Sequence, residues 1–258
     1  MKRMTPWLVS GMALFCAAAV QAADMEQANV RRVYTDNVAP ADQQAYEAGV
    51  KTFNKCLAEH GFKFRWTAWL HETGDTYQYS YVSDPATWAD FDAMQAQGKP
   101  CVGSWQTNAN PHLKGESSAF MQNRPELSHM VTDNSATAAL MGVTFFKLKP
   151  GHEAMEAFTE AVRKITAAAS KSKWPGSYMT LAVKDGGSGA PDFIVTSYSS
   201  SWADFGKQDN PTLWKTVEGA YGKADAASIR KSLNAAIQEV SSHIDSRSAD
   251  LTYTPSSR

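Results

Sequence analysis

Charged and aromatic side chains recur at every second position along one short segment of the sequence. They alternate with apolar residues, which is the pattern of a β-strand with one apolar face and one mixed face. Arginine binds carboxylates and phosphates through paired hydrogen bonds, tryptophan offers a flat surface, and histidine exchanges a proton near neutral pH. If the mixed face borders an enclosed space, it is therefore expected to bind an anionic or aromatic ligand. The residues are Lys63, Arg65, Thr67, Trp69 and His71.

A purely structural interpretation of this row is simpler. Lys63 and His71 would reach solvent at the two ends of the strand, and Arg65 would pair with a carboxylate such as Glu72 or Asp90. This arrangement would avoid the cost of burying a charge without a partner. Both interpretations stay open on the sequence alone.

A second strand, expected at 177–184, supplies further candidates. Aligning the two hairpins turn against turn places Thr180 in the environment of Thr67, and Lys184 in that of His71. The inward row of the second strand is then expected to be Tyr178, Thr180, Ala182 and Lys184.

The remaining histidines are weaker candidates. His129 lies on the expected last strand of the first half and could point inward. His60 and His243 are each expected in the last turn of a helix, where a positive charge suits the helix dipole. His112 and His152 are expected at exposed positions.

Motifs for stronger chemistry are not found, and no metal site is predicted. His152-Glu153 is not followed by a second histidine one turn later, and neither Cys56 nor Cys101 has a second ligand at a metal-binding spacing. The glycine-rich stretch 186–189 lies between two expected strands, so it predicts a hairpin turn rather than a phosphate loop. The catalytic residues, if there are any, stay unknown.

The tetrapeptide Trp-Ala-Asp-Phe occurs twice, at Trp88–Phe91 and at Trp202–Phe205. Each copy closes a stretch whose periodicities are those of strand, helix, strand and strand. The interval from a valine of the first strand to the next proline is also kept: Val33 to Pro40, and Val143 to Pro150. The sequence therefore predicts an internal duplication.

The elements of both copies are placed by apolar periodicity. The first copy has an expected strand at 32–38, a helix at 42–60 with the stripe Tyr46, Val50, Phe53 and Leu57, and a hairpin at 62–71 and 76–82. The second has a strand at 143–148, a helix from about 152 with the stripe Met155, Phe158, Val162 and Ile165, and a hairpin at 177–184 and 192–198.

The regions after the repeated tetrapeptides differ in length but share two landmarks, Asn110-Pro111 with Leu113 and Asn210-Pro211 with Leu213. An amphipathic helix is expected from about Asp225, with the apolar face Ile229, Leu233, Ile237, Val240 and Ile244. Final strands are expected at 128–132 and 250–254. The polar stretch 133–137 predicts the boundary, which gives a signal peptide at 1–22, a first unit at 23–135 and a second unit at 136–258.

The first residues are typical of a secretory signal peptide. Lys2 and Arg3 precede an apolar run from Trp7 to Val20, and small residues lie before the expected cleavage site at Ala22. The run is too short to span a bilayer as a stable helix, so the mature protein is expected to be periplasmic or secreted, without a membrane span.

The net charge is small. It is -1 for the whole chain and becomes -3 without Lys2 and Arg3, and the basic residues are scattered. Nucleic acid is therefore not an expected partner, because a phosphate backbone calls for a clustered basic surface.

Two cysteines remain after export, Cys56 and Cys101. In an oxidising compartment an even pair predicts a disulfide. The alternative is that Cys56, on the apolar stripe of its helix, is a small buried hydrophobic residue.

The order strand, helix, strand, strand, helix, strand is a split βαβ arrangement. With two such units in one chain, the sequence resembles the dimeric α+β-barrel superfamily, and is similar to the antibiotic-biosynthesis-monooxygenase-like and NIPSNAP-like proteins. Haem-using branches such as the chlorite dismutases share this order. The resemblance implies an α+β fold in which two tandem ferredoxin-like βαββαβ units pair their sheets into an intramolecular barrel. It covers about residues 30–255 and carries over no active-site residues.

The leading functional hypothesis is an exported barrel that binds a small apolar or aromatic molecule between its sheets, oriented by Arg65, Trp69 and His71. One alternative is a monooxygenase-like or haem-dependent oxidoreductase, with His71 or His129 as axial ligand or proton carrier. Another is an interaction protein without catalytic activity. No cofactor is expected under the first hypothesis, and under the second the enzyme would be either cofactor-poor or haem-dependent. The sequence does not determine the oligomeric state.

Overall fold

The computed structural model describes residues 28–131, 135 and 137–256. The expected signal peptide at 1–22 and most of the expected boundary at 133–137 lie outside the described residues, so both stay predictions. Within the described residues, none of the helices has the length and apolar character needed to cross a bilayer.

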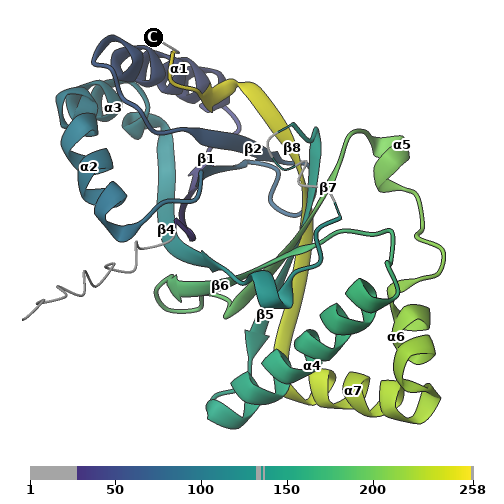
Figure 1. The fold of residues 1–258 in the computed structure, drawn as a ribbon. Helices are drawn as coiled ribbons and strands as arrows, with labels where there is room; N and C mark the ends of the chain where they lie inside the picture. Colours follow the sequence, from purple (N-terminus) through teal and green to yellow (C-terminus); the bar gives the residue numbers. More distant parts are fainter. Residues whose placement is uncertain (1–27, 132–134, 136, 257–258) are drawn as a thin grey trace, which may run out of the picture.

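Eight antiparallel strands of the described chain close into one barrel (Figure 1). The order around the barrel is β1-β3-β2-β8-β5-β7-β6-β4, so each half of the chain contributes four neighbouring strands. The halves join where β2 pairs with β8 and where β4 pairs with β6. This arrangement confirms the predicted fold class. The strands are β1 (Val30–Val38), β2 (Trp66–His71), β3 (Gln78–Ser83), β4 (Leu113–Asn123), β5 (Leu140–Leu148), β6 (Met179–Asp185), β7 (Phe193–Ser199) and β8 (Ile237–Tyr253).

Helices lie outside the barrel, in one group for each half (Figure 1). The first group is α1 (Gln43–Glu59), α2 (Trp88–Gly98) and α3 (Val102–Asn108), with the short 3₁₀ turns η1 (Lys99–Cys101) and η2 (Asn110–His112). The second group is α4 (His152–Lys171), α5 (Trp202–Phe205), α6 (Leu213–Tyr221) and α7 (Lys223–Ala236). A further 3₁₀ turn, η3 (Pro125–Leu127), follows β4.

The apolar stripes of α1 and α4 bury the outer face of the sheet. Tyr46 and Val50 of α1 pack in one cluster with Ala68 and Tyr79. On the other side the ring of Phe158 in α4 stacks on that of Phe193, with 4.7 Å between ring centroids. Each such side chain contributes about 1.5–3 kcal/mol through burial. Because these contacts use the outward residues of the strands, the inward residues are left to line the barrel.

The repeated tetrapeptide starts a helix in each half. In the first half the side chain of Thr87 accepts a hydrogen bond from the backbone N–H of Asp90, and the Asp90 carboxylate accepts one from the backbone N–H of Thr87. In the second half Ser201 caps α5 through the backbone N–H of Asp204. Hydrogen bonds to the carboxylates lower the pKa of Asp90 and of Asp204, chiefly those donated by backbone N–H groups. The repeat is therefore a helix N-terminus, which explains its spacing.

The predicted C-terminal helix is wrong beyond Ala236. The backbone becomes extended at Ile237, and the expected helical residues Ile237, Val240 and Ile244 lie on β8. No glycine or proline marks the end of α7, and the apolar spacing continues across the junction, so periodicity alone could not find the end. The expected final strand at 250–254 is the last part of β8.

The last strand of the first half is also placed elsewhere. It is β4, and in the described part of the expected segment, 128–131, His129 forms an isolated bridge with Tyr178. The Asn-Pro landmarks are not equivalent either, because Asn110-Pro111 lies in η2 before a strand, whereas Asn210-Pro211 lies before helix α6.

Cys56 of α1 and Cys101 of η1 form a disulfide. The structure therefore contains the predicted disulfide, and Cys56 is not the unpaired buried residue of the alternative interpretation. The bond fastens α1 to the segment that follows α2, on the outside of the barrel.

Candidate functional site

A cavity of about 440 Å³ lies inside the barrel. Every strand contributes at least one inward side chain to it, so its wall is the inner face of the closed sheet. The strand residues that line it are Arg31, Val33, Thr35, Thr67, Trp69, His71, Gln78, Ser80, Val82, Met121, Met141, Val143, Phe145, Met179, Leu181, Ile194, Thr196, Tyr198, His243 and Asp245.

The mixed row of β2 faces this cavity. Arg65, Thr67, Trp69 and His71 all line it, whereas Lys63 precedes the strand and is exposed. His71 is 7% exposed and Trp69 is 3% exposed, so His71 does not reach solvent as the structural interpretation expected.

Arg65 lies at one end of the row. Its Nη1 atom is 3.6 Å from Oδ1 of Asp84, which replaces the partners expected from the sequence, Glu72 and Asp90. Arg31, on the same inner face, donates to the backbone carbonyl of Ser83.

The expected inner row of β6 is wrong by one residue. Tyr178 bonds Thr166 of α4 through their hydroxyl groups, Thr180 donates to the carbonyl of Leu127, and Ala182 packs against Phe158. Lys184 is exposed near the strand end. The inward residues are Met179 and Leu181. A shift of one residue moves every side chain of a strand to the other face, and the two hairpin turns differ too much to fix the alignment.

Three polar side chains meet where β2 pairs with β8. The Nε2 atoms of His71 and His243 lie 3.7 Å and 3.1 Å from Oδ1 of Asp245. The two imidazole rings stack, with 4.1 Å between centroids. His71 Nε2 also lies 3.1 Å from the hydroxyl of Ser80. We call His71, His243 and Asp245 the His-His-Asp cluster.

The surroundings of His71 favour its neutral imidazole form. Burial lowers the pKa of His71, and the nearby Asp245 carboxylate only partly opposes this effect. A neutral imidazole can accept a proton or donate a lone pair to an electrophile. The cluster can therefore act as a base or as a ligand toward a molecule in the cavity.

Sequence reasoning missed two members of the cluster. The sequence predicts the end of a helix at His243 and gives no functional signal at Asp245. The duplication contained a signal that would have found them. The signal is a pair of serines that recurs in both copies, Ser117-Ser118 in β4 and Ser241-Ser242 in β8. The two pairs correspond because Val33 pairs with Ala119 and its counterpart Val143 pairs with His243.

The other histidines lie outside the cavity. His129 hydrogen-bonds the carbonyl of Trp174 through Nε2 and the hydroxyl of Ser170 through Nδ1, so both ring nitrogens are used. His60 ends α1, His152 begins α4 and is exposed, and His112 contacts Asp42.

The described residues do not fit a haem ligand set. His129 has no ring nitrogen available. A porphyrin bound to His71 would need open space on the lone-pair side of Nε2, but ligand atoms of His243 and Asp245 lie within 4.8 Å of that atom. The flat macrocycle would occupy the same space as these two side chains, so no haem-dependent step is assigned.

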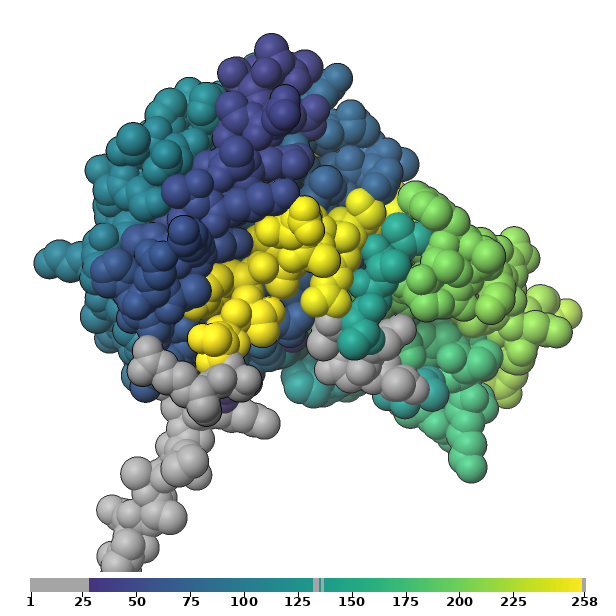
Figure 2. Space-filling model, turned by 90° about the horizontal axis from the view of Figure 1, so that it is seen from above, coloured from purple at the N-terminus to yellow at the C-terminus, as the bar shows by residue number. Residues whose placement is uncertain are grey.

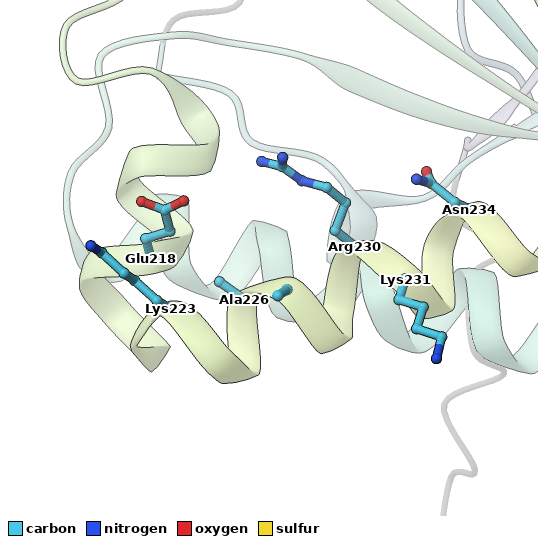
Figure 3. A pocket seen from close by; sticks show the side chains of 7 residues that line it. Glu218, Lys223, Ala226, Arg230, Lys231 and Asn234 are labelled. Atoms are coloured by element: carbon cyan, nitrogen blue, oxygen red, sulfur yellow. The ribbon is translucent and has the colours of Figure 1, made fainter.

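A second hollow, of about 390 Å³, lies on the outer surface between α6 and α7 (Figure 3). Arg230 and Lys231 leave α7 in different directions there, and the guanidinium of Arg230 lies 4.1 Å from the ring centroid of Trp214. Its charged side chains do not converge on one point, so it is a weaker candidate than the barrel cavity.

The fold is shared with several solved structures. A candidate monooxygenase from Lactobacillus acidophilus matches with a TM-score of 0.52 and 11% identity, covering 88% of this chain and 97% of that one. An anthrone oxidase-like protein matches with a TM-score of 0.50 and 13% identity, covering 86% and 92%. A chlorite dismutase variant from Candidatus Nitrospira defluvii matches with a TM-score of 0.50 and 14% identity, covering 87% and 94%.

No family model and no curated protein matches the sequence. The NIPSNAP-like part of the resemblance is not tested by the structural matches and stays a prediction. At such low identity, the matches establish the fold alone. This chain has the ferredoxin-like α+β-barrel fold, which is also the fold of the monooxygenase-like and chlorite dismutase-like structures.

Proposed function

We propose that this protein binds a small amphiphilic molecule, with an aromatic or apolar body and one polar group, inside its barrel. The observation that carries the proposal is the mixed wall of the cavity. Thr67, His71 and Ser80 of the first half and Asp245 of the second half supply polar groups, whereas Met141, Met179 and Leu181 supply apolar surface.

The dimensions and lining of the cavity support this proposal. Its volume falls within the ~300–1,000 Å³ typical of small-molecule sites, which are mostly apolar with a few convergent polar groups. Methionine side chains adapt to ligands of irregular shape. Trp69 supplies a flat surface in the cavity wall, with its ring centroid 6.2 Å from that of Tyr198.

The proposal includes export to the periplasm or beyond. The disulfide between Cys56 and Cys101 supports it, because such bonds persist in oxidising compartments. Fractionation of cells that express the full-length chain tests this part. Recovery of the protein in the cytoplasm with residues 1–22 still attached would contradict it.

Ligand binding is tested by fluorescence quenching with a neutral naphthylamine probe. Trp69→Phe should remove most of the quenching, because Trp69 lines the cavity. Trp66→Phe is the matched control, since Trp66 lies on the same strand but packs outside the barrel against Tyr253. Leu181→Lys should weaken binding at least about tenfold by placing a charge in the apolar wall. Equal quenching in Trp69→Phe and Trp66→Phe would exclude this site.

A second candidate function is oxidation of an acidic aromatic substrate without haem. It is favoured by the buried, neutral His71 on the cavity wall, which can remove a proton from the substrate. An anthrone, for example, would lose protons and react with O2 to give a quinone and water. His71→Gln should lower kcat for oxygen consumption by about 100-fold or more. An unchanged kcat would remove this role from His71.

A further inference from the structure

We propose that His71, His243 and Asp245 form a binding site for one divalent transition-metal ion on the wall of the barrel cavity. The proposal rests on these three side chains. A metal ion bound to Nε2 of His71 would occupy the lone pair of that atom, so it excludes the role of His71 as a base. A bound ion would face the space assigned above to the polar group of a ligand.

The distances in the His-His-Asp cluster suit a shared ion. Metal–nitrogen and metal–oxygen bonds of about 2.0–2.2 Å place neighbouring ligand atoms about 3–3.6 Å apart. The two Nε2 atoms lie 3.1 Å and 3.7 Å from Oδ1 of Asp245, and all three ligand atoms lie within 4.8 Å of one another. Small side-chain rotations would bring the three atoms around one ion.

One oxygen of the Asp245 carboxylate lacks a hydrogen bond, whereas the other, Oδ2, lies 3.3 Å from Nε2 of His243 and shares a hydrogen bond with it. Asp245 is 1% exposed, and its Oδ1 atom accepts no hydrogen bond from the described residues, although both imidazoles approach it. A buried carboxylate oxygen without a hydrogen bond is costly. A cation between Oδ1 and the two Nε2 atoms would provide the missing interaction.

The backbone holds the three ligands in place. His71 on β2 pairs directly with Asp245 on β8, and His243 lies two residues earlier on the same face of β8. Strand pairing therefore sets the spacing of the ligands. Ligands on strands of a closed sheet are held more rigidly than ligands on loops.

The chemistry of the ligands selects the class of ion. Two imidazoles with one carboxylate suit Fe²⁺, Co²⁺, Ni²⁺ or Zn²⁺, whereas Mg²⁺ and Ca²⁺ prefer oxygen ligands alone. Three protein ligands on one side leave coordination positions open toward the cavity, as at sites that bind substrate or water.

The test uses the mature, disulfide-bonded chain, stripped with EDTA and titrated with Co²⁺. The wild type should show ligand-field absorption in the visible range that saturates at one equivalent and is reversed by Zn²⁺. His71→Ala, His243→Gln and Asp245→Asn should each weaken Co²⁺ binding at least about 100-fold, since loss of even an outer partner of a ligand weakens binding 10–100-fold. His152→Ala is the control, because His152 is exposed and distant from the cavity.

Each outcome decides the proposal. The site would be established if the wild type and His152→Ala show saturable absorption and the folded ligand variants do not. No saturable absorption in the wild type, or folded ligand variants that bind Co²⁺ as the wild type does, would overturn it. If a variant does not fold, the wild type decides through its melting temperature, which Zn²⁺ must raise if the folded state binds the ion. Probe quenching measured in EDTA tests ligand binding separately.

Discussion

The two halves of the barrel share a backbone but present different inner surfaces. Val33 of β1 and Val143 of β5 occupy equivalent positions in the two halves. Val33 pairs with Val82 and Ala119, and Val143 pairs with Thr196 and His243, so these partners are equivalent to one another. At four inner positions the first half has a polar residue where the second half has an apolar one: Arg31 and Met141, Thr35 and Phe145, Thr67 and Met179, and Ser80 and Ile194. The reverse holds for Val82 and Thr196, Ala119 and His243, and Met121 and Asp245.

The two junctions between the halves differ in the same way. Where β2 meets β8, His71 pairs with Asp245, and where β6 meets β4, Val183 pairs with Met121 at the corresponding positions. The strand geometry is alike, so the chemistry of each junction depends on side chains alone. The difference concentrates polar groups at one junction of one cavity.

The largest expected effect comes from placing a charge at the apolar junction. Met121→Asp puts a carboxylate at the position that corresponds to Asp245, without two histidines beside it. We expect a loss of about 3–5 kcal/mol in the free energy of unfolding, because the buried charge has no partner. Urea unfolding measures this, with Met121→Leu as a control that should lose less than about 1.5 kcal/mol. Equal stability of both variants would show that the junctions are not different environments.

A second prediction concerns the outer faces. Asp36, which corresponds to Phe146 in the second half, is 1% exposed and accepts a hydrogen bond from Tyr46. Burial raises the pKa of Asp36 to about 7, and the hydrogen bond from Tyr46 only partly opposes this. Between about pH 4 and 7 the folded chain therefore keeps a proton that the unfolded chain has released, so stability falls as the pH rises through this window.

The fall should amount to at most roughly 4 kcal/mol over the whole window, because a difference of about three pKa units corresponds to about 1.4 kcal/mol for each unit. Urea unfolding at about pH 5 and about pH 8 measures it, and Asp36→Asn should remove most of the pH dependence. A dependence of the same size in Asp36→Asn would assign it to other groups.

Copying one junction onto the other is expected to have a smaller effect. The triple variant His71→Val, His243→Ala and Asp245→Met reproduces Val183, Ala119 and Met121 of the β4–β6 junction. The free energy of unfolding should stay equal or rise by about 1–3 kcal/mol, because apolar side chains often replace buried polar groups without loss. Thermal unfolding measures this. A large loss of stability would show that the cluster holds the barrel together rather than serving a ligand.

The smallest effect is expected at the repeated tetrapeptides. Thr87→Ala should destabilise the first half by about 1 kcal/mol, because it removes a capping box from α2. Ser201→Ala should cost less, since α5 is a single short turn from Trp202 to Phe205. Equilibrium unfolding of both variants compares the two copies, and a larger loss from Ser201→Ala would contradict this ranking.

The duplication and the fold class could be predicted because they depend on local patterns. Alternation placed the inward residues of β2, and helical spacing placed α1 and α4. The β6 row failed because a one-residue error in aligning two unlike turns inverts a strand, which put Thr180 in place of Leu181.

The His-His-Asp cluster could not be predicted from motif spacing. His71 and Asp245 are far apart in the sequence and meet only because β2 pairs with β8. The end of α7 has no stop signal, so the strand that carries two of the three residues was predicted as a helix. Comparing the two copies residue by residue would have corrected this, whereas periodicity could not.

Strand β8 belongs to both halves of the molecule. Its first part, Ile237–Ser246, pairs with β5, and its later part, from Asp245 to Tyr253, pairs with β2 (Figure 2, yellow). During synthesis the N-terminal half cannot complete its sheet until these late residues have emerged. A nascent or truncated chain would leave β2 as an open edge, available to pair with strands of other chains. Closure of the barrel cavity is therefore tied to the synthesis of β8, and Asp245 lies where the pairing with β5 and the pairing with β2 meet.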